Sequence, residues 1–269
     1  VRKHLFFLHM YMQTYKSYNM EENKPMFPTE EVTLPSKGLI YPQDNPLAKG
    51  VLEMKYMTAK EEDILTNESY IKNGSVIDKL LEALIVTPIN YNDLIVGDKN
   101  AIMIAARVLG YGKDYTFELD GEEHTVDLTE VKDKLMKEEH LQEKGKNEFE
   151  FTLPTVKKSI TFKLITHADE RKIENEVKGL KKINKSSSAE YTTRLKHTIL
   201  SVEGDYERKT VRQFVENGLL ARDARALREY IKEIQPDVDL TYDLENAAGD
   251  VKGVKIPIGI TFFWPDSEL

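Results

Sequence analysis

Two stretches of this chain resemble each other, and this internal repeat limits the folds that the sequence can adopt. The first stretch begins after Asp93 and the second after Gly218. At one constant spacing the matched pairs are Leu94/Leu219, Ile95/Leu220, Asp98/Asp223, Ala101/Ala226, Asp114/Asp239, Thr116/Thr241, Phe117/Tyr242 and Leu119/Leu244. A looser match lies upstream, between residues 32–35 and 151–154 and between residues 57–62 and 165–170. Such repetition indicates that one structural unit occurs twice.

The repeated unit predicts an α+β fold with an internal duplication. Each copy has a Thr-Leu-Pro turn, a strand, an acidic helix start and a helix, and each ends in a β-hairpin. We therefore expect a first repeat over residues 30–130, a charged, exposed connector over 131–148 and a second repeat over 149–269. Residues 1–29 are expected to be a disordered or over-extended N-terminus, with Met20 as the true start or with 1–19 as a partner-docking tail.

Composition narrows the possible functions. The formal charge of −8 disfavours broad binding to nucleic acid or to an anionic membrane, because both attract basic surfaces. The chain has no cysteine, which excludes disulfides, thiolate metal sites and cysteine nucleophiles. The short apolar run in residues 1–19 lacks the length of a membrane span and the cleavage site of a secretory signal.

Local patterns predict the start of several helices. Thr58 and Glu61 form the capping-box pattern, in which each side chain bonds the other residue's backbone N–H. Helices are expected over residues 96–109 and 221–233, and a further one over 191–202. Asp98 and Asp223 precede or open two of these helices, so we expect both to act as N-caps.

No pattern in the sequence calls for catalysis, a cofactor or a metal ion. The six histidines are far apart in the sequence. We expect each to lie at the surface or to support another polar residue, and not to bind a metal ion. Glu61 and Glu62 could form a two-carboxylate hydrolytic site, but helix capping explains them better. The cluster Lys178–Lys185 is expected to be a solvated helix end, with contact to an acidic partner as the alternative.

The C-terminal aromatic residues have two possible roles. Phe262, Phe263 and Trp264 lie next to each other, and Trp264 is the single tryptophan of the chain. Exposed aromatic side chains near a terminus make good anchors for a binding partner. The same residues could instead close the last hairpin onto the core, and the sequence favours neither role.

Several segments together resemble the T4-type bacteriophage baseplate protein family, which includes a hub subunit. The most specific is Leu34-Pro35-Ser36-Lys37-Gly38-Leu39-Ile40-Tyr41-Pro42. Supporting segments are Met57–Glu62, Leu94–Asp98, Ala106–Gly112, Val126–Leu128 and the ending from Val254 to Pro265. The resemblance extends from about Val32 to the end of the chain.

One feature departs from the family. Many of its members carry Cys-x-x-Cys pairs in the two hairpins, which gives them zinc-ribbon-like knuckles. Here the corresponding segments, 118–124 and 245–250, contain no cysteine. The resemblance therefore implies hairpins held by strand pairing and packing, without zinc.

The resemblance implies a non-catalytic phage tail protein that acts in assembly of the baseplate hub. Its expected partners are other tail or hub proteins or the tape-measure protein, and its expected location is the host cytoplasm during assembly or the virion baseplate. One alternative is a transient chaperone for the hub or the tape-measure protein. A tail-associated hydrolase is a further alternative, disfavoured because no catalytic arrangement is present.

Overall fold

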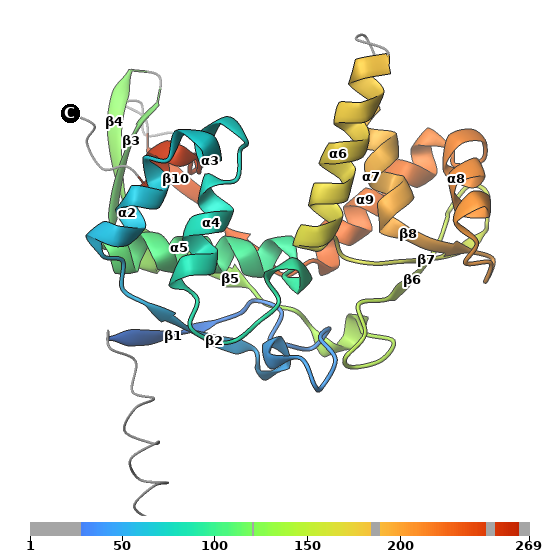
Figure 1. Cartoon of the computed structure of the whole chain (residues 1–269). Helices are drawn as coiled ribbons and strands as arrows, with labels where there is room; N and C mark the ends of the chain where they lie inside the picture. Colours follow the sequence, from blue (N-terminus) through green and yellow to red (C-terminus); the bar gives the residue numbers. More distant parts are fainter. Residues whose placement is uncertain (1–27, 120, 184–188, 246–250, 264–269) are drawn as a thin grey trace, which may run out of the picture.

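The computed structural model describes residues 28–119, 121–183, 189–245 and 251–263. Its helices are combined with small antiparallel sheets, so the α+β class is confirmed. Figure 1 shows two lobes side by side, one containing α2 to α5 and the other α6 to α9. The predicted tail 1–19 and the start at Met20 lie outside the described residues.

The first lobe begins with two strands and continues as helices. β1 pairs antiparallel with β2, with Thr33 opposite Val51. Between them runs the Leu-Pro-Ser-Lys-Gly turn, where Gly38 has φ +73° and a Cβ would lie 2.3 Å from the Ala48 carbonyl oxygen. The elements are β1 (Thr29–Thr33), η1 (Pro46–Lys49), β2 (Val51–Lys55), α2 (Ala59–Leu65), α3 (Glu68–Lys72), α4 (Val76–Leu84), η2 (Tyr91–Asp93), α5 (Val96–Tyr111), β3 (Asp114–Leu119), β4 (Glu122–Asp127) and η3 (Leu128–Glu130).

The remaining part of the chain likewise begins with two strands and continues as helices. Its elements, after the connecting β5 (Lys132–Lys134) and η4 (Glu138–His140), are β6 (Phe149–Thr152), β7 (Ser159–Phe162), α6 (His167–Ile183), α7 (Glu190–Thr198), β8 (Ile199–Val202), α8 (Arg208–Asn217), α9 (Ala221–Ile234), β9 (Asp237–Asp239), β10 (Thr241–Glu245), β11 (Val251–Lys255) and η5 (Ile260–Phe263). The helix expected over 191–202 is wrong at its end, because residues 199–202 form β8 and pair with β7. The first lobe has a reduced version of this pairing, a single bridge between Met54 and Ile85.

Most residues of the charged segment 131–148 are exposed, as its charge suggested, but the segment also makes specific contacts with the rest of the chain. β5 pairs antiparallel with β9, with Asp133 opposite Val238. Beyond β5, Met136 is buried and its N–H donates to the Pro35 carbonyl oxygen. These contacts tie the segment to both lobes.

The C-terminal part of the expected second repeat packs on the first lobe. The Tyr115 ring meets the Phe262 ring edge-on, with centroids 4.8 Å apart. The Tyr115 hydroxyl donates to the Pro257 carbonyl oxygen at 3.0 Å. Figure 1 places β10 beside the helices of the first lobe, far from α8. The range 149–269 is therefore not one spatially separate unit.

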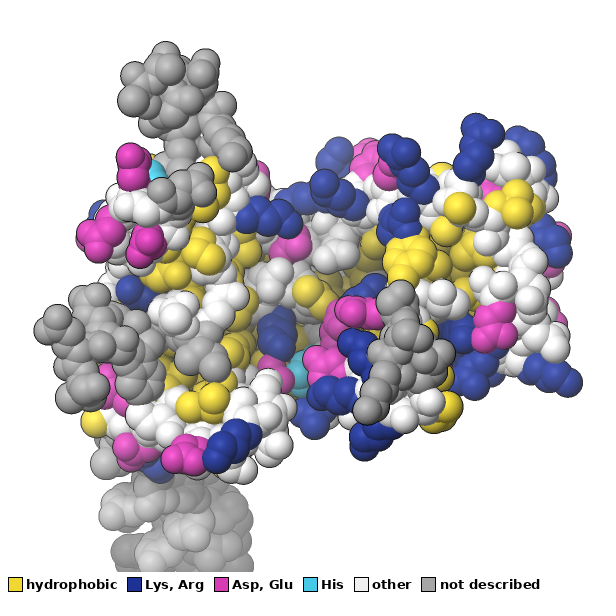
Figure 2. Space-filling view, turned by 90° about the horizontal axis from the view of Figure 1, so that it is seen from above, with side chains coloured by type: hydrophobic (Ala, Val, Ile, Leu, Met, Phe, Trp, Pro, Cys, Tyr) yellow, Lys and Arg dark blue, Asp and Glu magenta, His cyan; other side chains and the backbone are white. Residues whose placement is uncertain are grey.

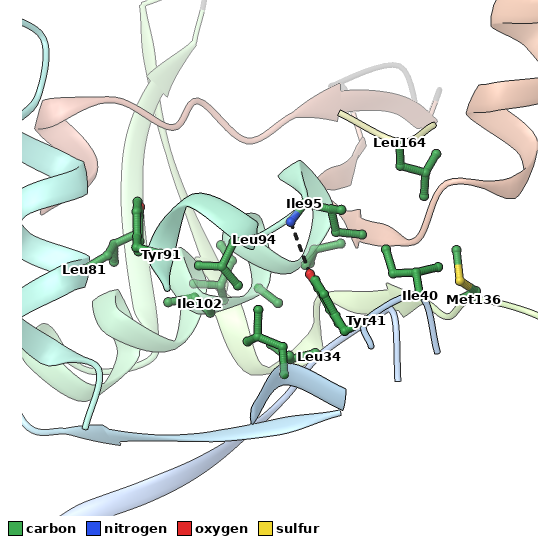
Figure 3. Close-up of a cluster of buried hydrophobic side chains, with 14 of the residues drawn as sticks. Leu34, Ile40, Tyr41, Leu81, Tyr91, Leu94, Ile95, Ile102, Met136 and Leu164 are labelled. Atoms are coloured by element: carbon green, nitrogen blue, oxygen red, sulfur yellow. Dashed lines mark hydrogen bonds between the residues drawn. The ribbon is translucent and has the colours of Figure 1, made fainter. Parts of the chain in front are cut away.

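The hydrophobic core runs through the junction of the lobes. Figure 3 shows Leu34, Ile40 and Tyr41 from the turn region packed near Leu94 and Ile95, with Leu164 of the second lobe close by. Each of these side chains is buried. Removal of this apolar surface from water is the main force that holds the two lobes together.

Candidate functional site

Two matched aspartates are fully buried, and neither acts as the expected N-cap. The N-cap residues of α5 and α9 are Ile95 and Leu220. Asp98 and Asp223 lie in the first turn of these helices, and each carboxylate accepts hydrogen bonds from a distant Leu-Pro turn. The N-cap prediction was wrong because sequence position alone could not show that another segment supplies the donors.

Asp98 joins the turn after β1 to the start of α5. Its Oδ1 accepts from the Ser36 backbone N–H at 2.9 Å, and its Oδ2 accepts from the Tyr41 hydroxyl at 2.6 Å. The Tyr41 oxygen in turn accepts from the Ile95 backbone N–H at 3.2 Å (Figure 3). Burial raises the pKa of Asp98, although the hydrogen bonds from Tyr41 and Ser36 oppose that effect.

Asp223 has the same role in the second lobe. Its two carboxylate oxygens accept from the backbone N–H groups of Thr155 at 2.6 Å and Val156 at 3.2 Å. Both turns also place a lysine in the left-handed region, Lys37 at φ 52° and Lys157 at φ 57°. In both lobes the residue after the Leu-Pro pair thus donates its backbone N–H to an aspartate in the first turn of a later helix.

The capping box at Thr58 and Glu61 is confirmed. The Glu61 Oε2 accepts from both the backbone N–H of Thr58 at 3.0 Å and its hydroxyl at 2.6 Å, and Lys55 bonds Oε1 at 2.7 Å. Although burial alone would raise the pKa of Glu61, the bonds from Lys55 and Thr58 outweigh burial and lower it.

The second lobe repeats this arrangement. The Asp169 carboxylate accepts from the Thr166 backbone N–H at 3.2 Å and hydroxyl at 3.0 Å, and from Lys163 at 2.8 Å. Burial opposes ionisation here too, but the bonds from Lys163 and Thr166 prevail and lower the pKa of Asp169. These buried carboxylates therefore already have structural partners.

One polar cluster joins the lobes and was missed in the sequence. Asp78 accepts from the Tyr91 hydroxyl at 3.0 Å and from Lys99 at 2.5 Å, and it lies 3.7 Å from the His167 ring nitrogen. His167 is buried rather than at the surface, and burial lowers its pKa. Its backbone N–H also donates to the Leu94 carbonyl oxygen at 2.7 Å. Since these residues are far apart in sequence, no local pattern could reveal the cluster.

The aromatic C-terminus does not form the exposed anchor considered above. Phe262 and Phe263 are 0 % exposed and pack against each other with centroids 5.2 Å apart. They close the C-terminal segment onto the first lobe. Trp264 lies outside the described residues.

A groove lies between the lobes, with a volume of about 1180 Å³. We call it the interlobe groove. Figure 2 shows this hollow from above, with Lys and Arg side chains gathered along it. Its walls come from α5, β5, β9 to β11 and the segment after β11 on one side, and from the β7–α6 junction, α7 and α9 on the other.

The interlobe groove has an apolar lining and a charged rim. Its apolar lining includes Val96, Ile165, Tyr191, Leu195, Ile231, Val238, Leu240, Ile256 and Ile258. Tyr191 is 42 % exposed, and the Arg228 guanidinium lies 4.4 Å from the centre of its ring. An open groove of this composition suits contact with another macromolecule better than chemistry on a small molecule.

The described residues contain no group of three or more His, Asp or Glu side chains arranged to hold a metal ion. None of the helices in this part of the chain combines the length and apolar character needed to cross a bilayer.

Comparison with models of protein families, with curated proteins and with solved structures found no match to this chain.

Proposed function

We propose that this protein is a non-catalytic component of a tailed-phage baseplate hub, acting in baseplate and tail assembly. The observation that carries the proposal is the resemblance of the segments beginning at Leu34, Met57, Leu94 and Ala106 to the T4-type baseplate family. The proposal concerns a role in assembly, with other tail or hub proteins or the tape-measure protein as partners.

The spatial arrangement of those segments supports the proposal. The Leu34–Pro42 segment bonds the Leu94–Asp98 segment through Ser36, Tyr41 and Asp98. A Cβ on Gly110 of α5 would lie 3.0 Å from the Met57 Cε, so these two motifs also touch. Residues that carry the resemblance therefore contact each other, as expected if they define one shared framework.

The polar groups also favour a structural role. Asp98 and Asp223 hold backbone turns, while Glu61 and Asp169 cap helices and bind lysines. A hydrolase of the two-carboxylate type needs a pair of carboxyl groups facing a substrate cleft. Glu61 is buried behind Lys55 and Thr58, which argues against that alternative.

A transient assembly chaperone remains the second candidate, because an open groove with exposed apolar residues could hold a partner reversibly. Quantitative mass spectrometry of purified virions beside infected-cell lysate distinguishes the two roles. A hub subunit is expected in virions at the level of other hub proteins. A chaperone would be abundant in the lysate and absent from virions. Absence of any association with tail intermediates would contradict both.

A further inference from the structure

We infer that the interlobe groove binds an acidic amphipathic helix of another protein. This inference deepens the proposed assembly role and depends on it for the identity of the partner. It rests on the size of the groove, its apolar lining and the excess of unpaired positive charge at its rim.

The size of the groove favours a peptide over a small molecule. Its volume of about 1180 Å³ exceeds the range of ~300–1,000 Å³ that is typical of small-molecule pockets. An α-helix with its side chains is about 10–12 Å across, and helix-in-groove recognition uses one apolar helix face against an apolar groove. Ile231 on α9 and Leu195 on α7 supply such a surface on one wall, and Ile258 contributes from the other.

The rim of the groove is basic even though the whole chain carries a net charge of −8. Seven basic and five acidic residues line the groove. Two of the acidic residues already have partners, because Glu170 binds Arg194 at 2.5 Å and Glu229 binds Arg225 at 2.8 Å. The other three, Asp133, Asp237 and Asp239, make no ion pair among the described residues, so the five unpaired cations named below exceed the unpaired carboxylates by two. Lys163 is likewise paired, with Asp169.

Several of the remaining cations have no carboxylate within ion-pair distance in the described part of the chain. They are Lys132, Lys134, Arg228, Lys232 and Lys255. Lys134 donates only to the Lys232 carbonyl oxygen, and burial lowers its pKa even though the nearby charges of Asp237 and Glu233 oppose that effect. A carboxylate brought into the groove would relieve this cost of desolvation.

Charge also discriminates between possible occupants. The N-terminal segment of this chain, residues 1–27, contains four basic residues against two acidic residues, so its charge matches that of the rim. An occupant of opposite charge that presents leucines or aromatics to the groove fits better. The chemistry therefore points to an acidic helix supplied by a partner.

The test uses the full chain and a fluorescein-labelled synthetic helix that has leucines on one face and glutamates on the flanks. Fluorescence anisotropy is expected to report binding that weakens as salt is added, because exposed charges are screened. A second peptide with lysines in place of the glutamates is expected not to bind. Equal binding of both peptides, or of neither, would overturn the inference.

Variants locate the site of binding. The triple variant Lys132→Glu/Arg228→Glu/Lys232→Glu is expected to lose at least about tenfold in affinity. The control Lys60→Glu/Lys181→Glu/Lys209→Glu makes the same change in net charge outside the groove and is expected to keep the affinity. Tyr191→Ala, at an exposed position, tests the apolar contact in a folded protein, with circular dichroism as the check on folding. Loss of binding only in the control variant would show that the peptide binds at another surface, which would contradict the inference.

Cross-linking in infected cells identifies the natural occupant. A photoreactive phenylalanine analogue at position 191 is expected to cross-link to an acidic amphipathic segment of a tail protein. A cross-link to a second copy, or to residues 1–27 or 264–269 of the same chain, would contradict the assignment. Because virion mass spectrometry does not depend on the groove, a protein found in virions but inert toward the acidic peptide would refute this inference alone. Peptide binding by a protein that has no tail association would refute only the assembly role.

Discussion

Asp98 accepts a hydrogen bond from the backbone N–H of Ser36, which lies 62 positions earlier in the chain. The bond anchors the Leu-Pro turn of the first lobe to the first turn of α5. Asp223 makes the equivalent connection in the second lobe, to Thr155 and Val156. At matched positions of the sequence repeat, each aspartate therefore accepts a hydrogen bond from the backbone N–H of the residue after a Leu-Pro pair, which supports the proposed duplication.

Replacing either aspartate should destabilise the protein strongly. Asp98→Ala leaves the Ser36 N–H and the Tyr41 hydroxyl buried without their acceptor, so we expect a loss of about 3 kcal/mol in the free energy of unfolding. Asp223→Ala should have a similar effect. Urea denaturation measures both, with Asp44→Ala at an exposed loop position as the control. A loss below about 0.5 kcal/mol in the aspartate variants would contradict the proposed anchoring role.

Gly97 sets the close crossing of α5 and the segment after α9. A Cβ at this position would lie 1.9 Å from the Pro236 carbonyl oxygen. Gly97→Ala should therefore force the backbones apart and cost about 2–3 kcal/mol. Gly179→Ala is the matched control, because Gly179 is also helical but has open space around it. The control should gain about 0.5–1 kcal/mol from better helix propensity. Equal thermal stability of the two variants would argue against the close crossing.

Phe262 should behave as a core residue. Phe262→Ala removes a ring that is 0 % exposed and contacts Tyr115, so the expected loss is about 3–5 kcal/mol. Ile183→Ala, at a position 87 % exposed, should change the stability by less than about 0.5 kcal/mol. Guanidinium denaturation compares the two. A stable Phe262→Ala protein would restore this residue as a candidate binding anchor.

Glu61 should make stability depend on pH in the acid range. Its pKa in the folded protein is lower than the usual 4.5, so its contribution is fully present above that pH and is lost as the pH falls through the folded value. Glu61→Gln should therefore be less stable than wild type at pH 7, by about 2 kcal/mol, and the difference should shrink below pH 4.5.

Urea titrations between pH 7 and pH 3 measure that difference. The raised pKa of Asp98 acts with the opposite sign, because its folded form takes up a proton more readily, but this effect is common to both proteins and cancels. Asp169→Asn should show the same behaviour, with the loss beginning below pH 3.8. If the difference in the free energy of unfolding stayed constant with pH, the ionised form of Glu61 would make no stabilising contribution.

The sequence alone determined the features that depend on near neighbours in the chain. The α+β class followed from the period of the hydrophobic residues, and the Thr58–Glu61 capping box from a spacing of three residues. The hairpin β3–β4 is the β-hairpin expected at the end of the first repeat. These signals are readable because both partners of each interaction lie within one turn or one hairpin.

The tertiary structure alone decided which distant groups meet. It brought Asp98 and Asp223 to the backbone N–H groups of the Leu-Pro turns. It made residues 199–202 a strand by pairing them with β7, and it buried Phe262 against Tyr115 of the first lobe. It also formed the interlobe groove from residues that are as far apart in sequence as Val96 and Ile258. Long-range contacts of this kind depend on how whole elements pack to bury apolar surface, and no local spacing in the chain encodes that choice.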